Sequence, residues 1–281
     1  MDTQILKTFV ILAKLRNFTK TADELFIAQS TVTNRITELE NEIGKSLLSR
    51  NKRRVELTEE GEQFYHYANR ILTLTEEGIR HINAMEQYEE KLHIGTTNTI
   101  YECYLDAKIK SYMTTHHNTA VRITISHSAE LIQSLQDGLM DMVFTYIPLY
   151  RAGHLCEVYA VDELVLVTSC ENDQYASGIC KEELKNTKYF YCNFALQEVG
   201  LFVRALFPPH YHFIFEIDNS TRLISYIMEL NGFSFVPERI AMPYIREGKL
   251  RRIELLDFQT PRINCYKITK DNHNVKCDFR P

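Results

Sequence analysis

The 281-residue sequence contains no tryptophan, no CxxC pair and no apolar run long enough to span a bilayer. A membrane helix needs about 20 consecutive apolar residues, so we expect no membrane partner. The first twenty residues carry charges and lack a small-residue cleavage site, so we expect no signal peptide either. These absences predict a cytoplasmic protein.

The cysteines are few and form no recognisable framework. Seven are scattered along the chain, at positions 103, 156, 170, 180, 192, 265 and 277. An odd number of dispersed cysteines in a reducing compartment favours packed thiols over a disulfide framework or a zinc site. We therefore expect no metal and no cofactor. A redox-sensing thiol remains an alternative, with Cys180 and Cys192 as the candidate pair.

Motifs of common catalytic sites are also missing from the sequence. GxGxxG, GxxxxGK[ST], HExxH and GxSxG do not occur. His116 and His117 are adjacent, so on a helix they would point to different faces and would not form a metal pair. An enzyme is therefore not expected, although an α/β cleft would leave that alternative open.

Positive charge is concentrated in one short segment, although the net charge is −5. Residues 43–55 include five cations and no acid, namely Lys45, Arg50, Lys52, Arg53 and Arg54. A local basic patch, rather than the total charge, determines attraction to phosphates. This segment is therefore compatible with a nucleic-acid partner.

Three short helices are predicted before the basic segment. Apolar residues at helical spacing predict a first helix over 5–14, and Thr19 is a candidate N-cap for a second over 20–26. A third helix is predicted by a buried stripe at Val32, Ile36, Leu39 and Ile43.

The opposite face of the third helix carries short amides and hydroxyls. These residues are Gln29, Ser30, Thr33, Asn34 and Thr37. Such side chains suit the donor and acceptor patterns of base edges in a major groove, whereas a merely solvated helix more often carries Lys and Glu. A solvated face without function is the alternative.

A β-hairpin and a long helix are predicted next. Apolar and polar residues alternate weakly in the basic segment, as in a hairpin wing. Arg50, Arg53 and Arg54 would contact the DNA backbone or the minor groove. From Thr58 a long helix follows, with an apolar stripe close to a heptad. We expect this stripe to pair with a second subunit, with burial in the chain's own body as the alternative. The stripe comprises Phe64, Tyr67, Ala68, Ile71, Leu74, Ile82 and Met85.

From residue 91 onward, apolar strands alternate with helices, which predicts parallel sheets in two α/β lobes. Ligands bind at the carboxyl ends of such strands, where helix N-termini favour an anion, so an anionic metabolite is the favoured ligand. The alternative to ligand binding is that each polar residue in these loops only caps the helix that follows it. The loop residues are Thr96, Thr97, Asn98, Thr99, Ser126, Ser128, Asn193, Asn219 and Ser220, which are polar, and Phe194.

Residues 18–61 form a pattern that spans the predicted second and third helices and the wing. Its positions are Phe18-Thr19, Ala22-x-x-Leu25, Ala28-Gln29-Ser30, Val32-Thr33, Ile36, Leu39-Glu40, Gly44, Leu47, Arg50 and Val55-x-Leu57-Thr58-x-x-Gly61. This pattern resembles the DNA-binding domain of LysR-type transcriptional regulators. The resemblance implies a bacterial winged helix-turn-helix protein that acts as a homodimer or homotetramer on double-stranded DNA. It leaves RNA polymerase open as a partner.

The resemblance also implies roles for particular residues. DNA contacts would come from Gln29, Ser30, Thr33, Asn34, Arg50 and Arg53. A small-molecule effector would lie between the two lobes, near Thr99, Ser128 and Phe194.

The expected fold class is mixed. An all-α winged helix-turn-helix over 1–58 and a linker helix over 59–90 would precede a two-lobed α/β effector-binding domain over 91–281, similar to periplasmic binding proteins. Lobe I would comprise 91–161 and 263–281, and lobe II 162–262. The expected effector contacts are Thr97, Asn98, Thr99, Ser128, Asn193 and Phe194.

Overall fold

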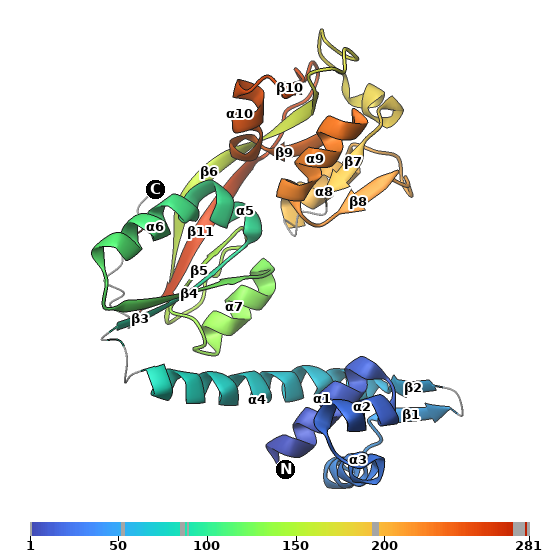
Figure 1. The fold of residues 1–281 in the computed structure, drawn as a ribbon. Coiled ribbons are helices and arrows are strands. Elements are labelled where there is room, and N and C mark those ends of the chain that lie inside the picture. The colour runs from blue at the N-terminus through green and yellow to red at the C-terminus, as the bar shows by residue number, and fades with distance from the viewer. Residues whose placement is uncertain are drawn as a thin grey trace. The chain divides into compact units, whose positions relative to one another are not determined.

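The computed structural model describes residues 2–51, 54–84, 88, 90–192, 197–271 and 279. The chain divides into two compact units, Met1–Gln87 and Tyr88–Pro281, which are considered separately. Figure 1 shows the helices and strands of each unit.

The N-terminal unit begins with three packed helices, α1 (Thr3–Leu15), α2 (Phe18–Leu25) and α3 (Gln29–Ile43). Their apolar faces share one core, in which Phe9, Leu12 and Ile36 are fully buried. The predicted stripe of α3 is confirmed at Val32, Ile36 and Leu39, whereas Ile43 at its end is only half-buried.

The N-cap of α2 differs from the prediction. Asn17 has extended backbone angles, and its side chain accepts a hydrogen bond from the Lys20 amide at 3.0 Å. Thr19 lies inside the helix instead and donates to the Gln29 Oε1 at 3.2 Å. The prediction of Thr19 as the cap was wrong because Asn17, two residues earlier, already satisfies a first-turn amide.

The predicted wing is a two-stranded antiparallel hairpin of β1 (Leu48–Asn51) and β2 (Arg54–Leu57). It is attached to α3 through Glu40, whose Oε1 accepts hydrogen bonds from the amides of Leu47 at 2.8 Å and Leu48 at 3.1 Å. The hairpin therefore has a fixed attachment to the C-terminal part of α3.

The long helix is α4 (Glu59–Ala84), and its predicted apolar stripe has two parts. Phe64 and Ala68 pack on the core of the N-terminal unit, with the Phe64 ring 5.6 Å from that of Phe9. The rest of the described stripe is exposed, namely Tyr67, Ile71, Leu74 and Ile82. Met85 lies outside the described residues. Burial in the chain's own body thus accounts only for the beginning of the stripe.

The C-terminal unit begins with a parallel sheet of β3 (Glu90–Thr96), β4 (Thr119–Ile125) and β5 (Met142–Thr145), with β3 in the middle. Between β3 and β4, helix α5 (Asn98–Ile100) continues through a π-helix (Tyr101–Leu105) into α6 (Asp106–Thr115). This helix packs on one face of the sheet, and α7 (Ser128–Gln136) packs on the other. Figure 1 shows α6 and α7 on opposite sides of the strands.

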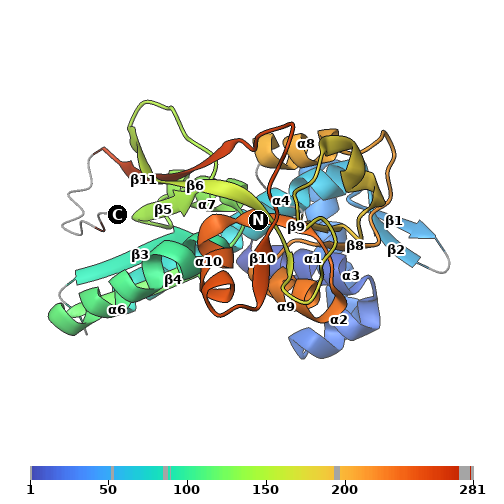
Figure 2. The same cartoon turned by 90° about the horizontal axis from the view of Figure 1, so that it is seen from above.

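Two long strands, β6 (His154–Ser169) and β11 (Arg262–Lys270), connect this first lobe to the second. They pair antiparallel and run side by side in Figures 1 and 2. β11 also pairs with β5 of the first lobe, while the C-terminal part of β6 pairs with β9 (Ser234–Pro237) and β10 (Leu250–Arg252) of the second. The two lobes therefore share a continuous sheet.

The second lobe contains a parallel pair, β7 (Phe190–Cys192) and β8 (Phe215–Ile217), and a 3₁₀-helix (Lys181–Asn186). Its α-helices are α8 (Gln197–Ala205), α9 (Ser220–Leu230) and α10 (Glu238–Arg246). The prediction of two α/β lobes is confirmed. The prediction of parallel pairing is correct for β3 with β4 and β5 and for β7 with β8. It is wrong for the pairs that involve β6 or β11, which are all antiparallel. Among the described residues, no helix is long and apolar enough to cross a membrane.

Candidate functional site

The polar face of α3 is exposed, as the sequence predicts. Gln29, Ser30, Asn34 and Thr37 are exposed and Thr33 is half-buried. The hydroxyls of Thr33 and Thr37 donate to the carbonyls of Gln29 at 3.2 Å and Thr33 at 2.9 Å. Rotation of either hydroxyl would free it for an external acceptor, so this face offers neutral donors and acceptors in one row.

Helix α3 starts without the usual side-chain cap. Ala28 is its N-cap residue and makes no side-chain hydrogen bond to the first turn. The Thr31 amide donates to the Ala28 carbonyl at 2.9 Å, while the amides of Gln29 and Ser30 receive no cap from the Ala28 side chain. A helix end of this kind favours a nearby anion such as a phosphate.

The structure describes the wing only in part. Arg50 pairs with Val55, and Arg54 with Asn51, in the hairpin register. The side chains of Arg50 and Arg54, and all of Arg53, lie outside the described residues. The proposal that the wing contacts phosphates therefore rests on the positive charge of these residues in the sequence.

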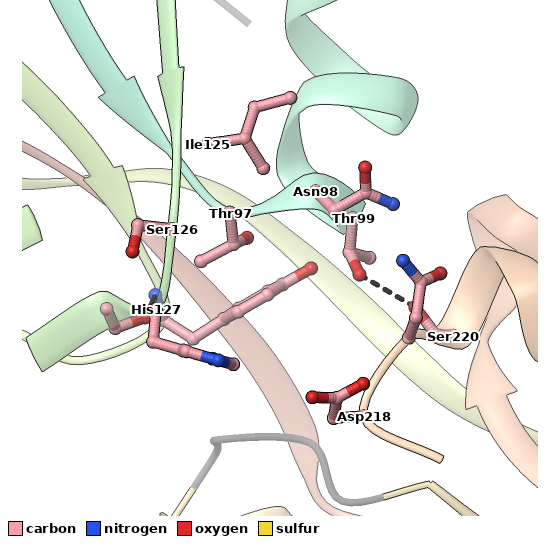
Figure 3. Close-up of a pocket in the computed structure, with 11 residues that line it drawn as sticks. Thr97, Asn98, Thr99, Ile125, Ser126, His127, Asp218 and Ser220 are labelled. Carbon is pink, nitrogen blue, oxygen red and sulfur yellow. Dashed lines mark hydrogen bonds between the residues drawn. The ribbon is translucent and has the colours of Figure 1, made fainter. Parts of the chain in front are cut away.

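A pocket of about 270 Å³ lies between the two lobes of the C-terminal unit. It brings together four of the predicted effector residues, Thr97, Asn98, Thr99 and Ser128 (Figure 3). Ser126, Asn219 and Ser220, which were also predicted as cleft-facing loop residues, line the same pocket. Asn193 and Phe194 lie outside the described residues.

Four lining residues were not predicted: Ile125, His127, Tyr146 and Asp218. Three of them adjoin predicted loop residues, since Ile125 and His127 flank Ser126 and Asp218 precedes Asn219. Tyr146 follows the last residue of β5. The position at the carboxyl end of a strand could have identified all four as candidates.

Two hydrogen bonds join the lobes directly at the pocket. The Asn98 Nδ2 donates to the Thr221 Oγ1 at 2.9 Å, and the hydroxyls of Thr99 and Ser220 lie 2.7 Å apart. Figure 3 shows the second of these contacts. The start of α5 is therefore tied to the start of α9, and a ligand that competes for these groups would alter the contact between the lobes.

The helix starts around the pocket differ in capping. The Thr97 hydroxyl accepts from the Ile100 amide at 3.4 Å, and the Asn219 Oδ1 accepts from the Arg222 amide at 2.9 Å. At α7 the side chain of the N-cap residue His127 makes no capping hydrogen bond. Ser128 is buried, and its Oγ accepts from the Tyr146 amide at 3.3 Å, which leaves its own hydrogen to donate.

The charged groups near the pocket are few. Asp218 lines it, and the Glu130 carboxylate accepts a hydrogen bond from Ser126 beside it. The described lining residues include no lysine and no arginine, and His127 is the only side chain among them that can become cationic. Burial raises the pKa of the Tyr146 hydroxyl well above its ordinary value.

Four of the described cysteines, Cys103, Cys180, Cys192 and Cys265, have surroundings that disfavour the thiolate. Burial raises the pKa of both Cys103 and Cys192 to about 12, and Cys265 is completely buried with a raised pKa. Burial, followed by the nearby carboxylates of Asp257 and Glu183, also raises the pKa of Cys180. Thiols of this kind stay protonated and react slowly as nucleophiles.

A winged helix-turn-helix followed by a two-lobed α/β domain with a pocket between the lobes defines a class of DNA-binding regulators that respond to a ligand. Comparison with known proteins identifies the family. Residues 3–62 match the bacterial regulatory helix-turn-helix proteins of the LysR family, and residues 86–274 match the LysR substrate binding domain. The chain belongs to the LysR family of transcriptional regulators and is not an enzyme.

Individual relatives agree with this assignment. The HTH-type transcriptional regulator CitR of Bacillus subtilis (strain 168) is 29% identical over 280 residues, which cover 95% of this chain and 93% of CitR. Among solved structures, the LysR family regulator CbnR superimposes with a TM-score of 0.69 at 22% identity, covering 97% of this chain and 93% of that chain. CbnR complexed with its target DNA gives a TM-score of 0.66 at 21% identity, covering 97% and 94%. These structures show the shared fold.

Proposed function

We propose that the exposed polar face of α3 contacts base edges in the major groove, while the wing contacts the DNA backbone. The base contacts would come from Gln29, Ser30, Thr33, Asn34 and Thr37, and the backbone contacts from Arg50, Arg53 and Arg54. The observation that carries this proposal is the row of exposed neutral amides and hydroxyls on α3, opposite fully buried Val32 and Ile36. The solved complex of CbnR with its target DNA has the same fold.

The chain would be divided by function as the sequence suggests, with DNA binding in 1–58, subunit pairing in 59–90 and effector binding in 91–281. The exposed residues Tyr67, Ile71, Leu74 and Ile82 on α4 support pairing of two copies. An apolar stripe on a helix surface is stabilised when a second helix covers it. A homodimer, or a homotetramer of two such dimers, would place two copies of α3 on one DNA site in the bacterial cytoplasm, where RNA polymerase is available as a partner.

The effector would bind in the pocket between the lobes with a carboxylate at the start of α7. Two features support this position: the amides of the first turn of α7 receive no side-chain cap from His127, and the buried Ser128 hydroxyl can donate. The free amides and the helix dipole both favour an anion there. Effector binding would change the angle between the lobes. DNA affinity would change with it, provided that the two lobe arrangements bind the effector with different affinities.

A redox trigger is the alternative that the thiol surroundings disfavour. The raised pKa values of Cys103, Cys180 and Cys192 keep these groups as thiols at neutral pH. A metabolite in the pocket is therefore the favoured trigger.

Two single variants test the DNA-binding proposal. Gln29→Ala should weaken binding to a preferred duplex by about 1–3 kcal/mol and leave binding to random duplex nearly unchanged. Arg53→Ala should weaken binding to both duplexes. It should also lower the magnitude of the slope of log affinity against log salt concentration by about one, because one fewer counterion is released. Fluorescence anisotropy titrations at several salt concentrations measure both effects. Equal losses on both duplexes for Gln29→Ala would contradict its role as a base contact.

A further inference from the structure

The ionisable groups around the pocket between the lobes are mainly acidic. Asp218 lines the pocket from the loop before α9, and Glu130 lies beside it through its hydrogen bond with Ser126. The described lining residues include no lysine or arginine. Among these residues, a purely anionic ligand would therefore meet the Asp218 carboxylate without a matching lysine or arginine.

The two ends of the pocket favour opposite charges. The uncapped start of α7 and the Ser128 hydroxyl favour a carboxylate. Asp218 comes from the other lobe and would attract a cationic or strongly donating group. Figure 3 shows Asp218 on the side of the pocket next to the loop that leads to Ser220.

We propose that the effector carries both a carboxylate and an ammonium group, as an amino acid does. The carboxylate would bind the first turn of α7, and the ammonium group would bind Asp218. This inference rests on the proposed function of the pocket as the effector site. A di- or tricarboxylic acid would place a second carboxylate close to Asp218 without a matching cation, and such like-charge contacts oppose binding.

A metal cation is a poor substitute for the ammonium group. In the part of the chain that the structure describes, no group of three or more His, Cys, Asp or Glu side chains could hold a metal ion. His127 also lines the pocket, but one imidazole and one carboxylate are too few ligands for a metal site.

Matched ligands can separate the two charges experimentally. The full-length chain is titrated at pH 8 with the standard L-amino acids, and each is compared with the acid that lacks its amino group and the amine that lacks its carboxylate. We expect one or more amino acids to raise the melting temperature, and each of the two truncated analogues to bind at least tenfold more weakly by calorimetry.

An Asp218→Asn variant assigns the ammonium contact. We expect this substitution to remove most of the preference for the amino acid over its deaminated acid, while Asp173→Asn, an exposed acid outside the pocket lining, keeps it. The melting temperature of each ligand-free variant shows whether it is folded. Binding of a simple acid or a dicarboxylic acid as tightly as the amino acid would overturn the inference and leave the effector pocket intact. Absence of binding by any compound of the panel would reject both the inference and the proposed role of the pocket.

Discussion

At the scale of single residues, Phe26 has a backbone conformation that its side chain does not favour. It ends α2 in the left-handed region with φ 55°, and its ring is 94% exposed. A bulky residue with positive φ is a true outlier, whereas asparagine adopts this conformation more readily. The exposed ring contributes little packing to offset the strain.

Replacing Phe26 with asparagine should therefore stabilise the N-terminal unit by about 1 kcal/mol, because left-handed strain is of order 1–3 kcal/mol for an ordinary residue. Urea unfolding of the full chain measures the change. Phe26→Ala is the matched control, since it removes the same ring but keeps a side chain that disfavours positive φ. Equal stabilisation by the two substitutions would mean that loss of the ring, rather than relief of strain, is responsible.

Asp162 is a second residue with a measurable effect, because its environment makes the stability of the protein depend on pH. It is buried on β6, and its carboxylate accepts from the Tyr104 hydroxyl at 3.1 Å and from the Glu163 amide at 2.9 Å. Burial raises its pKa and outweighs these hydrogen bonds, which lower it. The folded state therefore binds more protons than the unfolded state above about pH 4, the ordinary range of an aspartate.

The sign of the resulting pH dependence follows from proton linkage. Because the folded state holds the extra proton, Asp162 reduces stability as the pH rises from about 4 through its raised pKa. Asp162→Asn should remove this contribution and flatten the decline. The readout is the difference between wild type and variant in the free energy of unfolding, measured between pH 4 and 8. Asp173→Asn, at an exposed position, should leave the slope unchanged, and parallel curves for wild type and Asp162→Asn would refute the assignment.

At the scale of helices and strands, the capping of α2 can be tested by comparing substitutions of Asn17 and Thr19. The Asn17 side chain accepts from the Lys20 amide, while Thr19 contributes only an exposed hydrogen bond to Gln29. Asn17→Ala should lower the free energy of unfolding by about 1 kcal/mol, as loss of an N-cap does. Thr19→Ala should have a smaller effect in the same urea titration. The reverse order of effects would restore Thr19 as the cap.

Local patterns predicted some elements well and others poorly. The helices of the N-terminal unit and the wing follow from spacing and turn residues within a few positions of each other. The antiparallel pairing of β6 with β11 joins residues about a hundred positions apart, and no local signal specifies it. Helix α10 contains Pro243, a residue that usually ends a helix, so the sequence pattern does not predict this helix although it forms.

The effector pocket shows the same limit. Thr97, Asn98, Thr99 and Ser128 were predicted from their positions before helices, and the structure brings them to one pocket. Asp218 comes from the second lobe and lines the same pocket as Ser128, in a domain whose two lobes are connected by the paired strands β6 and β11. Which loops of the two lobes face each other depends on non-local strand pairing, which the sequence does not reveal.

At the scale of the whole molecule, the exposed stripe of α4 predicts how copies associate. Ile71 and Leu74 are each 38% exposed on one face of the helix. Ile71→Glu and Leu74→Glu should each weaken the dimer at least tenfold. A tenfold change in the dissociation constant corresponds to about 1.4 kcal/mol, and burying a charge in an apolar interface costs more than that. Analytical ultracentrifugation measures the dissociation constant. Thr73→Glu, at an exposed position on the opposite face of the helix, is the control, and unchanged association of both stripe variants would exclude this face as the interface.

The central claim is that the neutral polar face of α3 selects a DNA sequence. The most direct measurement compares the affinity of the purified full-length chain for a duplex selected from a random pool with its affinity for a scrambled duplex of the same composition. We predict that the selected duplex binds at least about 10³-fold more tightly at physiological salt. Equal affinity for the two duplexes, or no binding to either at low salt, would contradict the account.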